Sequence, residues 1–320
     1  MYKLHKDTDA FKTIISRIST DYSILPEIIE KDYYVTLLLQ EVLEKQECYD
    51  VFFKGGTALY KALKKINRFS EDIDLTFNDS RFNTTSAKHR ALKKVTSQYK
   101  SLLIDPNDSN SVSGSGSRTS VYTYSTLFVT DILKNDTLNR IGKVKVETTS
   151  FTTSSPVAKY EIEPILYTNA NEKDRKILRE EYEVDPFYID CISIQRIFID
   201  KLYAVEDYYL SDQSNRFIEM AKHMYDIHQL FALREIKEFL ASKEELENVI
   251  KLKEDEQIRR IGAKTIGKRV AAFEYFDFLE SEKIIKSFDA MQNTYVFNKA
   301  DFVEYITIGK SLTDILAILK

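Results

Sequence analysis

Two acidic side chains lie two positions apart in the stretch 68–75, which reads RFSEDIDL. Alternate side chains of a β-strand share a face, so Asp72 and Asp74 are expected to project together while their neighbours enter the core. Two adjacent carboxylates repel each other unless a cation lies between them. Hard oxygen ligands of this kind suit Mg²⁺, which takes one or two protein carboxylates and completes its shell with water and phosphate oxygens. The pair therefore predicts a site for one or two Mg²⁺ ions.

A glycine turn precedes this acidic pair. The strand-like run 49–53 leads into Gly55, Gly56 and Thr57, which open an amphipathic helix. Glycine lets the backbone approach a phosphate closely, and the first N–H groups of a helix are free to bind an anion. Such a turn alone is more often a simple cap. Together with the acidic pair it predicts a nucleoside triphosphate site, to which Arg68 and Ser70 could add contacts.

A third carboxylate is expected from a neighbouring strand. In the run 144–147 the alternation places Lys145 and Glu147 on one face and two valines on the other. Glu147 therefore fits as a further metal ligand. A solvent-facing alternation of lysine and glutamate would give the same pattern, and the sequence leaves both interpretations open.

A lysine interrupts the apolar stripe of a predicted helix after residue 193. Lys201 falls among apolar residues of that stripe, and a buried lysine is costly unless it meets an anion or extends to solvent. A triphosphate would be such an anion. Asp226 borders the stripe of the next helix and could orient Lys201 or an attacking hydroxyl, although a lone helical aspartate is more often a surface residue.

The elements around these residues predict an α+β protein. Helices over 8–18 and 25–46 precede a part with mixed strands and helices, and the pattern is helical from about residue 195 onward. We expect N-terminal helices over 1–45 that pack on the core, a mixed-sheet domain over 46–170, and a mainly helical domain over 171–320 that completes the active site.

Composition narrows the class of protein. The chain of 320 residues is 43% hydrophobic and 30% charged, which indicates folded domains rather than disorder. Two cysteines, no long apolar run and charges scattered through the first twenty residues favour a cytoplasmic protein. Residues 51–160 carry 17 Lys and Arg against 9 Asp and Glu, although the whole chain has a net charge of -4. This basic segment indicates an anionic partner or simply a solvated basic face.

The motifs resemble those of the AbiEii/AbiGii-type nucleotidyltransferases, the toxins of type IV toxin–antitoxin and abortive-infection systems. The resemblance lies in the Gly-Gly-Thr-Ala-Leu turn, the RFSEDIDL stretch, the Lys-Leu-x-Ala element at 201–204 and the element at 221–227, where Lys222 replaces an arginine. It covers about residues 50–230, and it leaves the role of residues 233–320 undefined.

The resemblance implies a polymerase-beta-like nucleotidyltransferase domain, a nucleoside triphosphate substrate and Mg²⁺. It strengthens Lys201 and Asp226 as catalytic residues beside Asp72 and Asp74. It also implies transfer of a nucleotide to RNA, most notably the 3′ end of tRNA, which would halt translation and growth. An antitoxin encoded nearby would counter the toxin without a stable complex.

Other functions remain open on the residues alone. The acceptor could be a protein hydroxyl, the chain could be a non-catalytic nucleotide-binding module, or the carboxylates could serve a metal-dependent nuclease. The basic helix expected over 86–103, with Arg140, Lys143 and Lys145, could contact an RNA backbone. Twenty tyrosines would permit base stacking.

Overall fold

The computed structural model describes residues 1–320 except 115, 129–140, 212–215, 261 and 297. Contacts divide the chain into two compact units, one of residues 1–62 and 71–191 and one of residues 63–70 and 192–320. Residues 171–191 thus group with the first unit and residues 63–70 with the second. The domain boundaries expected after residues 45 and 170 stay a prediction.

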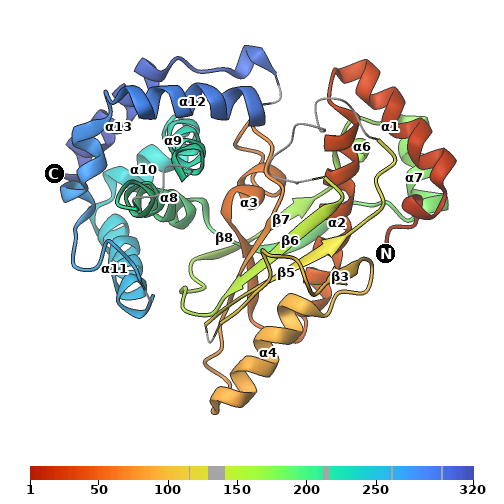
Figure 1. The fold of residues 1–320 in the computed structure, drawn as a ribbon, viewed down its shortest axis with the longest axis horizontal. Coiled ribbons are helices and arrows are strands. Elements are labelled where there is room, and N and C mark those ends of the chain that lie inside the picture. The colour runs from red at the N-terminus through yellow and green to blue at the C-terminus, as the bar shows by residue number, and fades with distance from the viewer. Residues whose placement is uncertain (115, 129–140, 212–215, 261, 297) are drawn as a thin grey trace. The chain divides into compact units, whose positions relative to one another are not determined.

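An eight-stranded mixed sheet forms the centre of the first unit (Figure 1). Its order is β3-β5-β6-β2-β1-β8-β7, and β4 also pairs with β5. Parallel pairs join β2 to β6 and β1 to β8, whereas β1 with β2 and β5 with β6 are antiparallel. The strands are β1 (Val51–Lys54), β2 (Ile73–Phe77), β3 (Leu103–Asp105), β4 (Val112–Ser113), β5 (Ser117–Thr123), β6 (Lys143–Thr149), β7 (Val157–Ile162) and β8 (Phe187–Ile192).

Helices cover the apolar side of this sheet. α2 contacts β1 and β6, and α4 contacts β5 and β6. α2 begins at Pro26, a residue whose fixed φ suits the first helical position. The helices of the unit are α1 (Thr8–Tyr22), α2 (Pro26–Gln46), α3 (Gly55–Lys61), α4 (Thr85–Ser97), α6 (Ile165–Thr168) and α7 (Glu172–Tyr182), after a short 3-10 helix at Leu4–Lys6.

Strand alternation gives the sheet two different faces. Phe53, Leu75 and Val146 are fully buried on the apolar face. Their neighbours on the same strands, including Lys54 and Asp74, point to the opposite, polar face. The core on one side thus fixes which side chains are presented together on the other.

The serine- and glycine-rich composition of residues 105–117 is typical of a flexible loop. In its described part, β4 pairs with β5 in an antiparallel register, so a short strand is present within it. Polar composition favours turns, but a neighbouring strand supplies backbone partners that composition does not reveal.

The second unit is helical. α9 contacts α8, α10, α12 and α13, so it is the central helix of the bundle. The segment 63–70 belongs to this unit because the Phe69 N–H donates to the Tyr295 carbonyl at 2.7 Å and Arg68 forms a β-bridge with Val296. The helices are α8 (Ile194–Tyr209), α9 (Phe217–Phe231), α10 (Arg234–Ala241), α11 (Lys243–Arg259), α12 (Glu282–Tyr295) and α13 (Tyr305–Leu319), with 3-10 helices at Val270–Ala272, Glu274–Phe278 and Lys299–Asp301.

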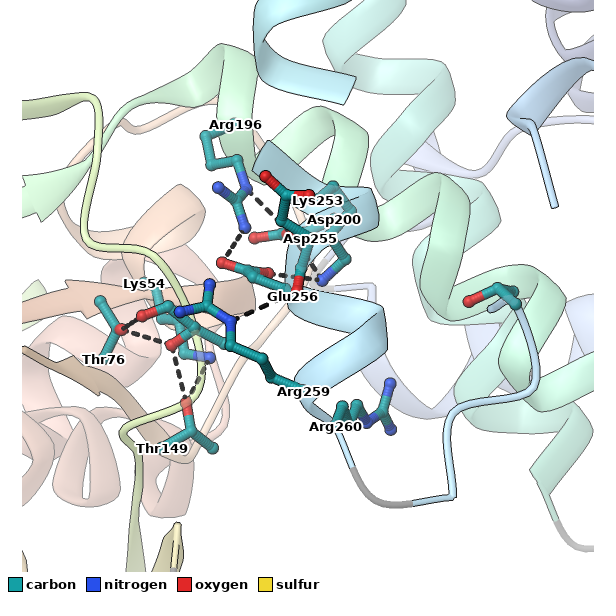
Figure 2. Close-up of polar contacts among 12 residues, drawn as sticks. Lys54, Thr76, Thr149, Arg196, Asp200, Lys253, Asp255, Glu256, Arg259 and Arg260 are labelled. Carbon is teal, nitrogen blue, oxygen red and sulfur yellow. Dashed lines mark hydrogen bonds and ion pairs between the residues drawn. The ribbon is translucent and has the colours of Figure 1, made fainter. Parts of the chain in front are cut away.

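An ionic seam joins α8 to α11 within this unit (Figure 2). The buried Arg196 guanidinium pairs with Asp200 at 3.1 Å and with Glu256, and Lys253 lies 2.8 Å from Asp200. Charges on both helices are thereby compensated inside the bundle.

The fold class predicted from the sequence, α+β with a mixed sheet and a mainly helical C-terminal part, is confirmed. None of the helices in the described part of the chain combines the length and apolarity needed to cross a bilayer.

Candidate active site

The glycine turn and the second acid of the pair are in direct contact. β1 ends at Lys54, and α3 begins at Gly55, whose φ of +78° is in the left-handed region that favours glycine. A Cβ placed on Gly55 would lie 2.2 Å from Oδ2 of Asp74. Only a residue without a side chain allows this approach, so the turn and the acid form one structural feature.

Three carboxylates share the polar face of the sheet. Asp74 on β2 is in register with Glu147 on β6. Asp72 immediately precedes β2, and its Oδ2 lies 2.8 Å from the Lys145 Nζ, which is on the same strand as Glu147. Lys145 therefore links the first acid to the face that carries the other two.

Burial and neighbouring charges together shift the pKa values of Asp74 and Lys145. Burial, followed by the nearby Glu147 carboxylate, raises the pKa of Asp74 to about 7, and Lys54 and Lys145 only partly oppose the rise. The pKa of Lys145 is raised by the three carboxylates, although its burial acts in the opposite direction. The face therefore favours added positive charge.

Lys54 is a residue of this face that the sequence analysis missed. It is in register with Asp74, and its Nζ donates to the Thr149 Oγ1 at 3.1 Å (Figure 2). Thr149 in turn shares a hydrogen bond of 3.0 Å with Thr152, which also contacts the Thr76 hydroxyl. Lys54 directly precedes the glycine turn and is one strand position from the buried Phe53, so alternation alone could have identified it.

The donor set fits Mg²⁺. Within the described residues, no three His, Cys, Asp or Glu side chains are already gathered as a ligand cluster. Mg²⁺ needs only one or two carboxylates, however, because water and phosphate oxygens complete its shell. Asp72 and Asp74 supply such a pair, on the face that also carries Glu147. The role of Glu147 as a further ligand stays a prediction.

Thr57 connects α3 to the backbone of the acidic pair. Its side chain is fully buried, and its hydroxyl donates to the backbone carbonyl of Asp72. Gly56 lies in the first turn of α3, and the half-buried Ser70 belongs to the segment grouped with the second unit. Phosphate binding by these residues stays a prediction.

A second charged centre lies within the helical unit. Asp226 on α9 is fully buried and accepts from Arg68 Nε at 2.7 Å and Nη2 at 2.6 Å, while the Lys201 Nζ lies 2.6 Å from its Oδ2. Burial raises the pKa of Asp226, but the two cations outweigh this effect and lower it to about 2. The anion that meets the buried Lys201 in this structure is therefore Asp226.

This centre changes the interpretation of Arg68. The sequence predicts that Arg68 could contact the triphosphate. In the structure its guanidinium forms a bidentate pair with Asp226 and also donates to the Phe69 carbonyl at 3.0 Å. The long sequence separation hid this pairing. His223 on the same helix has a pKa well below its usual value, because of burial and then the adjacent Lys201 charge. Direct phosphate binding by Arg68 and Lys201 stays a prediction.

Comparison with known proteins agrees with these motifs. A profile described as "Nucleotidyl transferase AbiEii toxin, Type IV TA system" matches residues 37–306. No curated protein matches the chain. Among solved structures, the chain is similar to MenT4, a nucleotidyltransferase toxin from Mycobacterium tuberculosis H37Rv, with 12% identity, a TM-score of 0.45 and coverage of 96% of this chain and 98% of that one. The profile spans most of the sequence and confirms the resemblance: the chain belongs to the AbiEii family of nucleotidyltransferase toxins of type IV toxin–antitoxin systems.

Proposed function

We propose that the chain is a Mg²⁺-dependent enzyme that transfers a nucleoside monophosphate from a nucleoside triphosphate to RNA, with the 3′ end of tRNA as acceptor. Modification there would block translation and growth in the cytoplasm. The observation that carries the proposal is the contact between Gly55 and Asp74, on a face that also presents Asp72 and Glu147. It joins a turn able to approach phosphate to carboxylates able to hold a divalent cation.

The residues of this face act by positioning and charge. In the transfer, an acceptor hydroxyl loses its proton to water and its oxygen forms a bond to the α-phosphorus, while the bond from that phosphorus to the bridging oxygen breaks and pyrophosphate leaves. Asp72 and Asp74 would hold Mg²⁺, which when bound neutralises phosphate charge. Lys54 and Lys145 place two ammonium groups on the same face. Such a site needs no nucleophilic side chain, because placement and electrostatics supply the rate enhancement.

A basic helix supports RNA as the acceptor. α4 contains no Asp or Glu, and it exposes four side chains that can contact phosphates: His89, Arg90, Lys93 and Lys94. Positive charge on an exposed helix contacts a nucleic-acid backbone without reading its sequence. Of the other basic residues expected to contact RNA, Lys143 and Lys145 form ion pairs with carboxylates of the chain, unlike the exposed residues of α4. Arg140 lies outside the described residues.

Lys201 and Asp226 are proposed to serve the reaction as a charged pair. Their buried contact, shared with Arg68, gives the ammonium a fixed position. Replacement of Lys201 by methionine, which has a similar shape without charge, should abolish transfer while the variant still binds Mg²⁺ on the carboxylates. Retained transfer would remove Lys201 from the reaction.

The direct test is incubation of the purified protein with total RNA, Mg²⁺ and each radiolabelled nucleoside triphosphate in turn. We expect a labelled band at the size of tRNA and none with Asp74→Asn. A labelled protein band would indicate a protein acceptor, and shortened RNA would indicate a nuclease. Absence of any labelled product with all four nucleotides would favour a binding module and overturn the proposal.

Growth provides a second readout. Expression of the chain alone should slow bacterial growth, and Asp74→Ala should restore it. A neighbouring antitoxin gene should also restore growth, while its product should not co-purify with the toxin. Equal toxicity of the Asp74→Ala variant would separate any growth effect from nucleotide transfer.

A further inference from the structure

Lys145 contacts the acidic pair at the position where the proposed function requires a metal ion. Its Nζ lies 2.8 Å from Oδ2 of Asp72, and both side chains are about one third exposed, at 35% each. Strand alternation places Lys145 on the same face as Glu147, two residues further along β6, and Glu147 is in register with Asp74. One ammonium thus faces all three carboxylates.

Two cations compete for one carboxylate oxygen. An ammonium already bound at Oδ2 of Asp72 repels a divalent ion that approaches the same group, because the charges would be only a few ångströms apart. We propose that Lys145 is the resident counter-ion of the acidic pair: without nucleotide it holds Asp72 in place and weakens metal binding, and it leaves Asp72 when a metal–nucleotide complex enters. This inference rests on the proposed function, since it takes the carboxylates as metal ligands.

The released ammonium has an evident second partner. A triphosphate brings negative charge to the same face, and a lysine ammonium is a compact point charge with three donors that suits phosphate oxygens. Lys145 would therefore exchange a carboxylate for a phosphate as the substrate binds. Metal ion and nucleotide would then bind with positive cooperativity, because each favours the state in which Lys145 has left Asp72.

The chain offers a matched control on the same strand. Lys143 is two residues before Lys145, on the same face of β6, and its Nζ lies 2.7 Å from Oδ2 of Asp108. It has a similar exposure of 29% and an ion pair of similar length. Loss of Lys143 therefore reproduces the loss of a strand lysine and its ion pair without removing the counter-ion of the acidic pair.

The experiment titrates the full-length protein with Mn²⁺ in the absence of nucleotide and follows free Mn²⁺ by electron paramagnetic resonance. Lys145→Met should bind Mn²⁺ about fivefold more tightly than wild type, the upper range for a partly exposed ion pair. Its metal-free melting temperature should be lower, because three carboxylates then face each other without that ammonium. Lys145→Arg should retain the weak binding, and Lys143→Met should leave the affinity unchanged. Lys145→Gln serves as a second neutral variant if the methionine variant does not fold.

Equal or weaker Mn²⁺ binding by the neutral Lys145 variants would overturn the counter-ion role while leaving the metal site in place. Failure of the proposed function has a different signature. If Asp74→Asn binds Mn²⁺ as well as wild type does, with and without a non-hydrolysable nucleotide, the carboxylates are not the metal ligands.

Discussion

Gly55 and Asp74 are packed so closely that the space for a β-carbon on Gly55 is already occupied by the Asp74 carboxylate, 2.2 Å from the ideal Cβ position. The φ of +78° adds a second, independent demand for glycine. The effect of the positive φ can be separated by experiment from the effect of the close approach to Asp74. Gly262 has the same φ but no neighbouring atom where a Cβ would lie.

Replacement of Gly55 by alanine should disrupt both stability and transfer. Gly262 has the same φ of +78° but no atom within 4 Å of its ideal Cβ. Gly262→Ala should therefore cost about 1–2 kcal/mol, the strain of a non-glycine residue in this conformation. Gly55→Ala should cost at least about 1 kcal/mol more, because the Asp74 side chain must also move. Chemical denaturation of both variants measures the difference, and equal costs would mean that the close approach is unimportant.

The charge of Asp74 should lower stability as the pH rises. Its pKa of about 7 in the folded chain exceeds the ordinary value near 4. Between these two values the unfolded chain releases a proton that the folded chain keeps, so the free energy of unfolding falls as pH rises through this window. Asp74→Asn stays neutral and removes the fall. With a chelator present, we expect the variant to gain about 1–2 kcal/mol relative to wild type between about pH 4 and pH 8, after allowance for solvent screening.

Denaturant unfolding at several pH values checks this expectation. Asp289→Asn, at an exposed position of α12, should show no such pH-dependent gain. Added Mg²⁺ should stabilise wild type at pH 8 and leave Asp74→Asn unchanged. A constant difference between Asp74→Asn and wild type across the whole pH range would contradict the raised pKa.

Neutralisation of the buried Asp226 carboxylate should strongly destabilise the chain. Asp226→Asn leaves Arg68 and Lys201 buried without their anion, a loss of about 3–5 kcal/mol. Because the pKa of Asp226 is lowered to about 2, its contribution should be fully present above about pH 4 and lost only as pH falls towards 2. Asp185→Asn, which breaks an exposed pair with Arg179 at 3.9 Å, should cost less than about 1 kcal/mol. Similar costs for the two variants in thermal or chemical unfolding would rule out a buried ionic centre.

The basic face of α4 should contribute to RNA affinity and not to nucleotide binding. Replacement of both Lys93 and Lys94 by glutamine should raise the KM for RNA. It should also reduce the salt dependence of RNA binding by about 0.7 in log–log slope for each phosphate that a lysine no longer neutralises. The KM for the nucleoside triphosphate should not change. The control replaces Lys237 and Lys251, two exposed lysines of the helical unit, by glutamine and should leave the salt dependence of RNA binding unchanged. An unchanged salt slope in the α4 variant would place the acceptor elsewhere.

Local pattern was sufficient for much of the site and insufficient for its charge pairing. Alternation along β2 and β6 correctly placed Asp74 and Glu147 on one face, because a buried core on the other side fixes the register. The turn at Gly55 was likewise visible as a strand followed by glycines. Lys145 was interpreted only as an RNA contact, since nothing in a strand pattern reveals that Asp72 lies within 2.8 Å.

Contacts between distant segments were the part that could not be predicted. Arg68 and Asp226 are separated by 158 residues, and helical periodicity shows only that each lies near an apolar stripe. Helical periodicity leaves open whether Lys201 meets an anion or extends to solvent; in the structure it is buried against Asp226, a side chain of the neighbouring helix. Pairings of this kind depend on how α8 and α9 pack, which side-chain spacing within one helix does not determine.

The grouping of residues 63–70 with the helical unit has a consequence for biosynthesis. Arg68 and Phe69 leave the ribosome long before Asp226 and Tyr295, the residues to which they bind. In a nascent or truncated chain that ends before Asp226, Arg68 therefore lacks this carboxylate. The strands that pair with β2, which carries Asp74, have by then been synthesised. The Arg68–Asp226 and Phe69–Tyr295 contacts can therefore form only after the message has been translated past the codon for residue 295.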